Sequence, residues 1–547
     1  MTHSTLAVND RSAVLDSAHV GDIHGAFGTI KHGDTEARTG LSAKMKTLLA
    51  VVGPGLIVMC GDNDAGAFST YGQAGQDYGT HLLWVLLLLV PVLYVNQEMV
   101  VRLGAVTGVG HGKLILERFG RFWGAFSVID LFLLNALTVV TEFIGITLSA
   151  GYLGLPKVPA VLGAGLVVFA AASTGSFRRF ERVVLTLCAG SLLLIPLALM
   201  LHPAAGRMAT GFVLPSMPGG TQLSTVMLLI IGMVGTTVAP WQLFFQQSYV
   251  IDKRITTRFL KYEKADLWIG IVVVVVGAAA VIGLAAAAFA GTGGAGNFVD
   301  AHGLAAGIAA KAGHLAGVLF AIALLDASVI GAFAVSLSTA YAIGDTFGIN
   351  HSLHRGMKQA KGFYAVYGGL IAIAAAVVLI PGSPLGLITN GVQAMAGVLL
   401  PSASVFLLLL CNDREVLGPW VNGRKTNMFT SAVLGVLVTL SVILTASVLF
   451  PDISAGQIGD IMMVCGAAGI AMAGSALLRR RPAAEVDEFA GLTPAEVENW
   501  RMPPLVELGK AQMSTTRKIG MSALRLYLAV AAALIVVKIV ELALAGH

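Results

Sequence analysis

The stretch GPGLIVMCGDNDAGAF, residues 53–68, interrupts an apolar segment that runs from about residue 46 to about residue 75. Two carboxylates, Asp62 and Asp64, fall in the middle of this segment. An ionised carboxylate near the centre of a bilayer costs at least about 2.5 kcal/mol. We therefore expect the helix to open here, with both carboxylates facing a wet cavity or a bound cation. A helix end at the membrane interface is the alternative interpretation.

A second interruption lies in the apolar run GMVGTTVAPWQ, residues 232–242. Pro240 lacks a backbone N–H, and its ring clashes with the preceding helical turn. Carbonyl groups freed before Pro240 become cation ligands where they line a cavity. The alternative is a simple kink, in which Thr236 and Thr237 hydrogen-bond to their own helix.

The composition places both interruptions in a membrane protein. Of 547 residues, 56% are hydrophobic and only 12% are charged, which excludes an ordinary water-soluble globule. The net charge of +5 is explained by where Lys and Arg lie relative to the membrane, so it does not indicate nucleic-acid binding. The four cysteines are far apart, without the paired spacing of a zinc site or a disulfide framework.

Apolar runs of about 20 residues predict an all-α polytopic membrane protein with about thirteen spans. They lie near residues 46–75, 80–104, 122–150, 158–173, 182–202, 223–248, 266–291, 305–345, 362–381, 386–411, 428–450, 457–478 and 521–544.

Charge in the connecting segments predicts the orientation of these spans. Basic residues gather in alternate loops, and the positive-inside rule makes those loops and the N-terminus cytoplasmic. These residues are Arg118, Arg121, Arg178, Arg179, Lys253, Arg254, Arg258, Lys261, Arg355, Lys358, Arg424, Lys425 and Arg479 to Arg481. We expect a disordered cytoplasmic tail over 1–45, a membrane domain over 46–478, a cytoplasmic polar segment over 479–520 and an additional C-terminal membrane helix over 521–547.

Other polar residues at membrane depth are weaker signals. Glu142 is a candidate proton or cation site, with a structural hydrogen bond as the alternative. Gln393 offers an amide oxygen to an ion, or a hydrogen bond that joins two helices, and Asp326 is interpreted in the same way. Glu98 and Arg102, four residues apart, are better explained as an ion pair within one helix.

The pattern resembles the NRAMP family of divalent metal transporters over about residues 46–478. The stretches that carry the resemblance are Gly53-Pro54-Gly55, Arg102 to Gly108, Glu142-Phe143-Ile144-Gly145, and Asn412-Asp413-Arg414 followed by Asn422. The resemblance implies a LeuT-type fold with two inverted five-helix repeats, in which the first and sixth helices are broken.

The resemblance also implies which residues hold the ion. The family's Asp-Pro-Gly-Asn motif falls on residues 64–67 and its Met-Pro-His motif on residues 239–241, so this chain keeps the aspartate but has Ala67, Ala239 and Trp241 in place of the asparagine, methionine and histidine. Gln393 matches a glutamine that the family uses as an ion ligand. Glu142 matches the family's glutamate, while Val139 stands where an aspartate is expected.

These departures have a chemical direction. A thioether selects softer metals, so a site with Ala239 retains only hard oxygen donors, which suit Mg²⁺. The chain therefore resembles the NRAMP-related branch of magnesium transporters, and the missing His and Asp suggest weak or absent proton coupling. The site expected is Asp64 as the main charged ligand, Asp62 and Asn63 as support or holders of water, the carbonyls of Gly61 and Thr236, the position of Ala239, and Gln393.

The main hypothesis is a secondary transporter that carries hydrated Mg²⁺, and also Mn²⁺, across the cell membrane by alternating access. The alternative is a proton-coupled Mn²⁺ or Fe²⁺ symporter of the NRAMP type. An intramembrane enzyme is disfavoured because the chain lacks a His-Glu-x-x-His or Gly-x-Ser-x-Gly motif. A receptor would need a larger soluble domain. We expect membrane lipid around the protein, no nucleic-acid partner and no resident cofactor.

Overall fold

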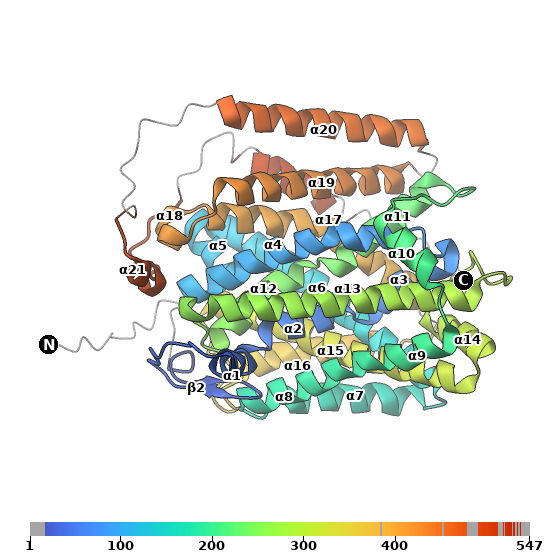
Figure 1. Cartoon of the computed structure of the whole chain (residues 1–547), viewed down its shortest axis with the longest axis horizontal. Coiled ribbons are helices and arrows are strands. Elements are labelled where there is room, and N and C mark those ends of the chain that lie inside the picture. The colour runs from blue at the N-terminus through green and yellow to red at the C-terminus, as the bar shows by residue number, and fades with distance from the viewer. Residues whose placement is uncertain are drawn as a thin grey trace.

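The computed structural model describes residues 17–382, 385–450, 453–478, 489, 491–511, 518, 520–527, 529–530, 533 and 537. Helices dominate this part of the chain, and most run nearly parallel to the long axis of one bundle (Figure 1). The strands are β1 (Ile23–His24) and β2 (Thr29–Ile30). The helices are α1 (Leu41–Val51), α2 (Pro54–Asp62), α3 (Ala65–Tyr78), α4 (Leu83–Thr107), α5 (His111–Phe119), α6 (Arg121–Tyr152), α7 (Lys157–Ala172), α8 (Phe177–Cys188), η1 (Ala189–Leu193), α9 (Leu194–Leu201), α10 (Ala205–Val213), α11 (Leu223–Thr237), α12 (Pro240–Asp252), η2 (Thr257–Phe259), α13 (Leu260–Phe289), α14 (Ala301–Ala312), α15 (His314–Phe347), α16 (Lys361–Val378), α17 (Leu385–Cys411), α18 (Arg414–Leu417), η3 (Gly418–Trp420), α19 (Arg424–Leu449), α20 (Ala455–Leu478) and α21 (Pro494–Asn499).

The apolar helices account for most of the predicted spans. Within the described residues, nine helices are long and apolar enough to cross a membrane, and the bent pair α1 and α2 makes up to ten. The helix α7 and the described first part of α20 are shorter apolar helices at two further predicted positions. The predicted span 305–345 is wrong in its boundary, because Gly313, in a backbone conformation with φ of 92°, separates α14 from α15. Most of the predicted helix 521–544 lies outside the described residues.

Both predicted interruptions are breaks in helices. The first span ends as α2 at Asp62 and resumes as α3 at Ala65, and Asp64 caps α3 because its side chain accepts a hydrogen bond from the Ala67 N–H. The second span ends as α11 at Thr237 and resumes as α12 at Pro240. Proline is favoured at the first position of a helix, where no N–H donor is needed.

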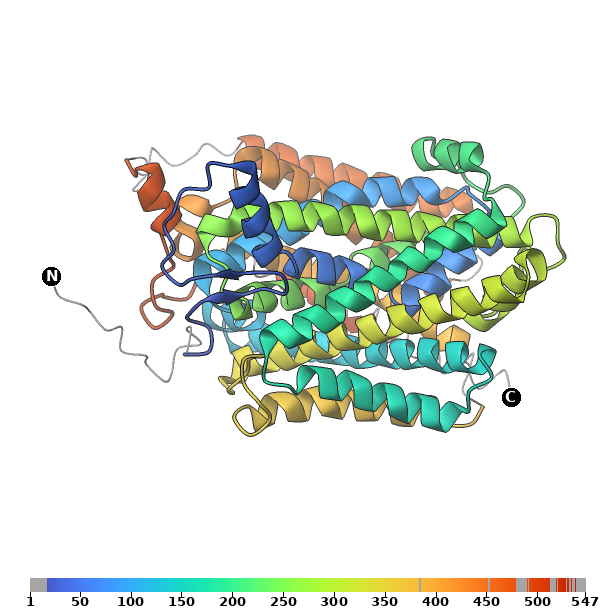
Figure 2. The same cartoon turned by 60° about the horizontal axis from the view of Figure 1, so that its bottom comes forward.

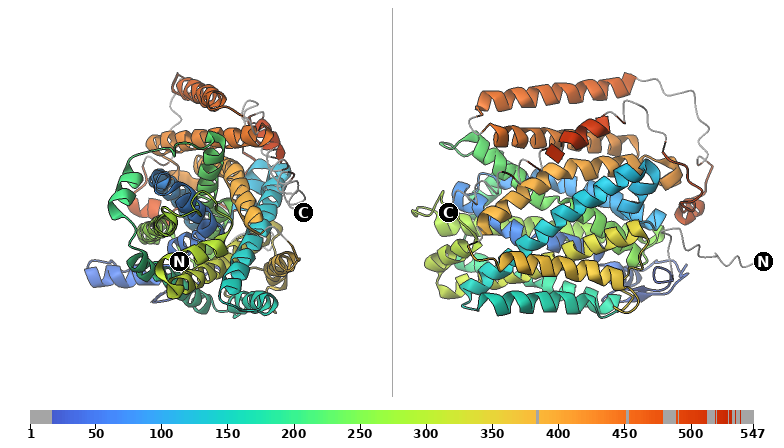
Figure 3. Two further views of the ribbon diagram at one scale, coloured as in Figure 1. Left: turned by 90° about the vertical axis from the view of Figure 1, so that its right-hand side faces the viewer. Right: turned by 180° about the vertical axis from the view of Figure 1, so that it is seen from behind.

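Close approach of helices at glycine positions holds the centre of the bundle together. A Cβ atom on Gly235 of α11 would lie 2.3 Å from the Gly397 nitrogen of α17. The views along and behind the bundle show α17 beside α11 and α6, with α20 outermost (Figure 3). Small residues at such crossings allow helix backbones to pack closely, which drives helix association in lipid.

The N-terminal segment differs from the disordered tail expected over 1–45. Residues 23–30 form an antiparallel hairpin, with Ile23 opposite Ile30, at the end of the bundle beside α1 (Figure 2). Arg178 donates hydrogen bonds to the carbonyls of Gly25 and Gly28, and Arg254 donates to that of Ala18. Basic loop residues, which the sequence analysis used only for orientation, thus order the backbone from residue 18 onward. Residues 1–16 lie outside the described residues.

The polar segment predicted over 479–520 is also in contact with the bundle where it is described. Its helix α21 lies at the same end as the hairpin (Figure 1). The indole N–H of Trp420 donates to the Val497 carbonyl at 3.0 Å, and the hydroxyl of Thr257 donates to the Glu498 carbonyl. These contacts attach α21 to the loops before α13 and after α18.

One ion pair fixes the loop between α15 and α16. His351 Nε2 lies 3.0 Å from Asp345 Oδ1, and its Nδ1 lies 2.7 Å from the carbonyl oxygen of Ile349. Burial lowers the pKa of His351, but the Asp345 carboxylate and these hydrogen bonds outweigh burial and raise the pKa from 6.5 to about 9.

We predict that this ion pair stabilises the fold fully below about pH 6.5 and that its contribution is lost as the pH rises through about 9, because a raised folded-state pKa favours the protonated, folded form. Thermal unfolding of the purified protein should show that His351→Asn flattens this part of the stability profile. A control variant, His314→Asn at the exposed start of α15, should keep the wild-type slope. An equal slope in all three proteins would contradict the prediction.

Candidate cation site at the two helix breaks

The two helix breaks lie against each other in the centre of the bundle. The Tyr71 hydroxyl of α3 and the Thr237 hydroxyl of α11 are 2.7 Å apart. The side chain of Gln242 on α12 donates from Nε2 to Asp62 at the end of α2. Hydrogen bonds therefore join each half of one broken span to a half of the other.

Asp62 is held by an amide that the sequence analysis did not select. Its Oδ1 accepts from Gln242 Nε2, which also lies 3.3 Å from the Thr237 carbonyl, and Gln242 Oε1 accepts from Gln97 of α4 at 3.0 Å. Asp62 is 1% exposed, and its Oδ2 atom has no hydrogen-bond partner in the described part of the chain. A buried carboxylate oxygen without a donor is a ready ligand for a cation or a proton.

Asp64 is the second carboxylate at the break. Its Oδ1 accepts from the Ala67 N–H at 2.8 Å, and the neighbouring Ala65 N–H donates to Glu142 Oε2 of α6 at 3.1 Å. A Cβ atom on Gly331 of α15 would lie 2.5 Å from Glu142 Oε2 and 2.9 Å from the Asp64 Cβ atom. The glycine therefore leaves the space in which both acidic side chains approach α15.

Gln393 reaches the breaks from α17. Its Oε1 accepts from the Thr236 hydroxyl at 2.7 Å, and its Nε2 has no partner in the described residues. A Cβ atom on Gly66 would lie 1.8 Å from Gln393 Nε2 and 3.2 Å from Asp64 Oδ1. The structure thus brings the predicted ligand residues Asp62, Asp64, Thr236 and Gln393 to the two breaks, with the Thr236 hydroxyl rather than its predicted carbonyl in contact with Gln393, and it places Glu142, predicted as a separate proton or cation path, beside Asp64.

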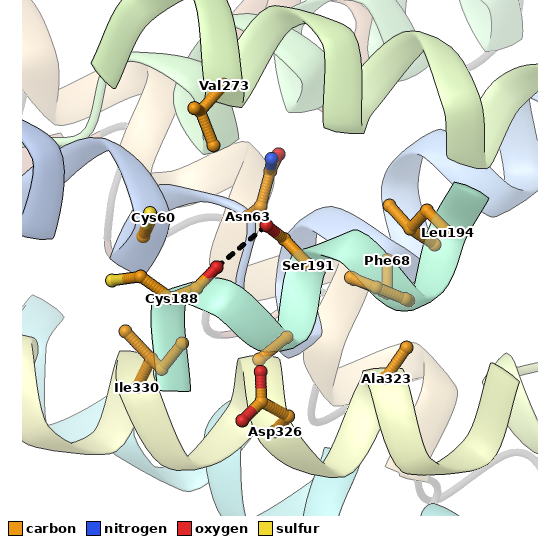
Figure 4. Close-up of a pocket in the computed structure, with 11 residues that line it drawn as sticks. Cys60, Asn63, Phe68, Cys188, Ser191, Leu194, Val273, Ala323, Asp326 and Ile330 are labelled. Carbon is orange, nitrogen blue, oxygen red and sulfur yellow. Dashed lines mark hydrogen bonds between the residues drawn. The ribbon is translucent and has the colours of Figure 1, made fainter. Parts of the chain in front are cut away.

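One predicted site residue, Asn63, is placed differently. The amide of Asn63 donates to the Val274 carbonyl of α13 at 3.2 Å, so this side chain turns away from α11 and α12. It borders a cavity of about 20 Å³ that Cys60, Cys188 and Asp326 also line (Figure 4). Gly61 lies against Trp241 and Ala334, and Ala239 is the buried N-cap of α12. Asn63 therefore does not join the carboxylates at the breaks, because its donor pairs with α13.

The donor atoms at the breaks are oxygens of carboxylates, amides, hydroxyls and backbone carbonyls. Nowhere in the described chain do three or more His, Cys, Asp or Glu side chains group so that they could hold a metal ion. Two carboxylates supplemented by neutral oxygens and water suit a hard, partly hydrated divalent cation. The sequence analysis did not select Gln242, although it is a polar residue in an apolar run, two positions after Pro240.

Comparison with known proteins identifies the family. The sequence pattern described as "Natural resistance-associated macrophage protein-like" (Nramp) matches residues 55–447, well over half of the chain. The chain belongs to the Nramp family. Among Nramp relatives, the divalent metal cation transporter MntH of Ralstonia nicotianae is 28% identical over 402 residues, which cover 70% of this chain and 87% of the relative. MntH of Burkholderia ambifaria is 30% identical over 325 residues, covering 54% and 68% of the two chains.

A solved transporter structure shows the same fold. The manganese transporter of Eremococcus coleocola, in complex with an aromatic bis-isothiourea substituted compound, superimposes with a TM-score of 0.63 at 20% identity and covers 80% of this chain and 95% of its own. The LeuT-type fold with broken first and sixth helices, expected from the sequence, is confirmed.

We predict that Gln242→Ala destabilises the protein by about 1–3 kcal/mol, because Asp62 then loses its buried donor. Gln246→Ala, one turn further along α12, is the matched control, since neither polar atom of the buried Gln246 has a hydrogen-bond partner in the described chain. Chemical unfolding of the purified variants in detergent measures both effects. A loss for Gln246→Ala as large as that for Gln242→Ala would contradict the assigned role of the amide.

Proposed function

We propose that this Nramp protein transports divalent metal cations across a membrane through the site at the two helix breaks. The observation that carries the proposal is the pair of buried carboxylates, Asp62 and Asp64, where helices α2, α3, α11 and α12 end or begin. The similar MntH proteins are named divalent metal cation transporters, which supports a divalent metal cation as the substrate here.

The comparisons favour the second of the two sequence hypotheses for the metal. MntH relatives and a manganese transporter are similar to this chain, which supports an Nramp-type carrier of Mn²⁺ or Fe²⁺ over a dedicated magnesium transporter. We propose Mn²⁺ as a substrate on this basis. The oxygen donors at the breaks and Ala239 in place of a thioether support acceptance of Mg²⁺ as well.

The proposed transport cycle uses the breaks as hinges. Asp64 and the free Oδ2 of Asp62 supply negative charge that offsets the loss of water from the cation, and Gln393 contributes its amide oxygen after exchanging its bond with Thr236. Alternating access then exposes this site to the two sides of the membrane in turn. The open backbone at each break gives the half-helices freedom to tilt separately.

Glu142 is the titratable group that bears on proton coupling in the proposed transport. Glu142 lies beside the break, where its Oε2 accepts from the Ala65 N–H, and its Oε1 has no partner in the described residues. With Val139 and Trp241 at the positions discussed above, we propose that cation transport proceeds without a fixed proton stoichiometry and responds to membrane voltage.

The proposed orientation places the hairpin end of the bundle in the cytoplasm. Arg178, Arg254 and Arg258 make their hydrogen bonds with the N-terminal segment at this end. This agrees with the excess of basic residues in the same loops of the sequence. The cell membrane is the proposed location.

We predict that Asp64→Ala reduces uptake of Mn²⁺ and Mg²⁺ into proteoliposomes at least about tenfold, because the site loses the charge that compensates desolvation. Asp62→Ala should be milder if Asp62 acts through a bound water. Simultaneous recording of internal pH tests the proposed lack of coupling. Full uptake by a correctly folded Asp64→Ala variant would disprove the site, and metal-dependent acidification that Glu142→Gln abolishes would establish proton coupling.

We also predict that Ala239→Met shifts competition toward Cd²⁺ and Mn²⁺ and away from Mg²⁺, since the thioether adds a soft donor and takes space from hydrating water. Ala170→Met, on the exposed face of α7, is the control for a methionine outside the site. Inhibition of Mn²⁺ uptake by each competing metal gives the readout. An unchanged order of competition would show that residue 239 does not face the cation.

A further inference from the structure

A second group of buried charges lies away from the helix breaks, at the end of the bundle that carries the hairpin. It consists of Glu181 on α8, Lys253 directly after α12, and Glu263 and Asp266 on α13, and we call it the Lys253 cluster. All four side chains are at most 1% exposed. Three carboxylates thus share one buried ammonium group, and the transport site uses none of them.

Glu181 and Lys253 form a matched pair. Glu181 Oε1 lies 2.5 Å from Lys253 Nζ, and its Oε2 accepts from the Ala26 N–H of the hairpin at 2.6 Å. Lys253 Nζ also donates to the Val52 carbonyl at 2.8 Å, just before α2. The positive charge of Lys253 is therefore balanced by Glu181.

The negative charge of Asp266 is stabilised by hydrogen bonds from backbone N–H groups. Its Oδ2 accepts from the Gly53 N–H at 3.1 Å and from the Gly55 N–H at 2.6 Å. These donors belong to the start of α2, where the helix dipole favours a negative charge. Its other oxygen, Oδ1, has no partner in the described residues.

Glu263 has no such compensation. Both of its carboxylate oxygens are buried and lack a hydrogen-bond partner in the described part of the chain. Glu263 and Asp266 are three residues apart on α13, so their side chains lie on one face of the helix. An ionised Glu263 would be an uncompensated buried charge beside a second carboxylate, which costs several kcal/mol.

We propose that Glu263 and Asp266 bind one proton between them. A proton on Glu263 removes the excess negative charge and provides the donor that the free Oδ1 of Asp266 lacks. A metal ion is disfavoured as the ligand, because the Lys253 ammonium group already lies against Glu181 and because Glu181, Glu263 and Asp266 do not form a group of three that could hold a metal ion.

The bound proton stabilises the docked arrangement of the hairpin and α2. Their amides at Ala26, Gly53 and Gly55 all donate to carboxylates of the Lys253 cluster. When Glu263 ionises, repulsion from Asp266 and Glu181 favours entry of water, and these docking bonds weaken. Low pH therefore favours the docked state and high pH favours its release. This inference does not depend on which cation is transported.

The surroundings of Glu263 support a proton shared within α13. The charged groups that act on Glu263 are Asp266 on its own helix, Lys253, and Glu181 of α8. Tyr249 of α12 and Cys188 of α8 are further titratable side chains in the neighbourhood of Asp266. On α1, Lys44 and Lys46 are exposed. Lys264, the next residue along α13, pairs with Glu98 of α4.

Hydrogen–deuterium exchange on the purified full-length protein, without metal, tests the docking. After correction for intrinsic rates, peptides covering residues 23–56 should exchange at least about tenfold faster as the pH rises from about 6 to about 9, where buried glutamates titrate. Glu263→Gln, which is neutral at every pH, should reduce this change to less than about twofold. Glu117→Gln, which alters a surface pair with Lys113, should behave like the wild type.

Infrared spectroscopy of the same samples tests the proton directly. The carbonyl-stretch band of a protonated carboxyl group should be present near neutral pH in the wild type and reduced in Glu263→Gln. If Glu263→Gln does not fold, Glu263→Leu provides the neutral side chain, and titration of the wild-type band still reports the proton. Unchanged infrared bands, or the same pH dependence of exchange in Glu263→Gln, would overturn the proposal. Neither measurement involves metal uptake, so failure here and failure of the proposed transport function are distinguishable.

Discussion

Burial of carboxylates where lipid cannot hydrate them is the constraint on which the centre of this structure depends. Asp62 and Asp64 are tolerated because the backbone opens at both of them and supplies N–H groups, while Gln242 supplies a side-chain donor. One oxygen of Asp62 is nevertheless left without a partner in the described chain. The local fold thus supplies hydrogen bonds to most of these carboxylate oxygens and leaves one oxygen of Asp62 for the proposed divalent cation.

Glycine determines how closely the surrounding helices approach this site. At Gly66 a side chain would occupy the position of the Gln393 amide, and at Gly331 it would collide with Glu142. The glycines therefore have two effects. They let the helices approach closely, and they leave space for polar side chains from distant parts of the sequence. Substitution at these positions would affect the site and the packing together.

At the hairpin end of the bundle, too, a buried carboxylate accepts hydrogen bonds from backbone N–H groups at the end of a helix. The helix α2 begins on the Asp266 carboxylate and ends on Asp62, so a single short helix links the Lys253 cluster to the proposed cation site. The two ends of α2 are about 13 Å apart, given the rise per residue of an α-helix. Ionisation of the Lys253 cluster therefore takes place at one end of the same helix, α2, whose other end carries Asp62.

The sequence by itself determined the membrane class, nearly all of the spans and both helix breaks, because hydropathy and proline act through local physics that needs no knowledge of distant contacts. It also selected Asp62, Asp64 and Gln393, since polar residues in an apolar run are conspicuous. Only the tertiary structure decided that Asn63 faces α13, that Gln242 serves Asp62 and that the N-terminal segment is ordered by Arg178 and Arg254. The direction of a side chain at a helix break and the partner of a buried charge depend on residues 100 or more positions away, and no local pattern in the chain records them.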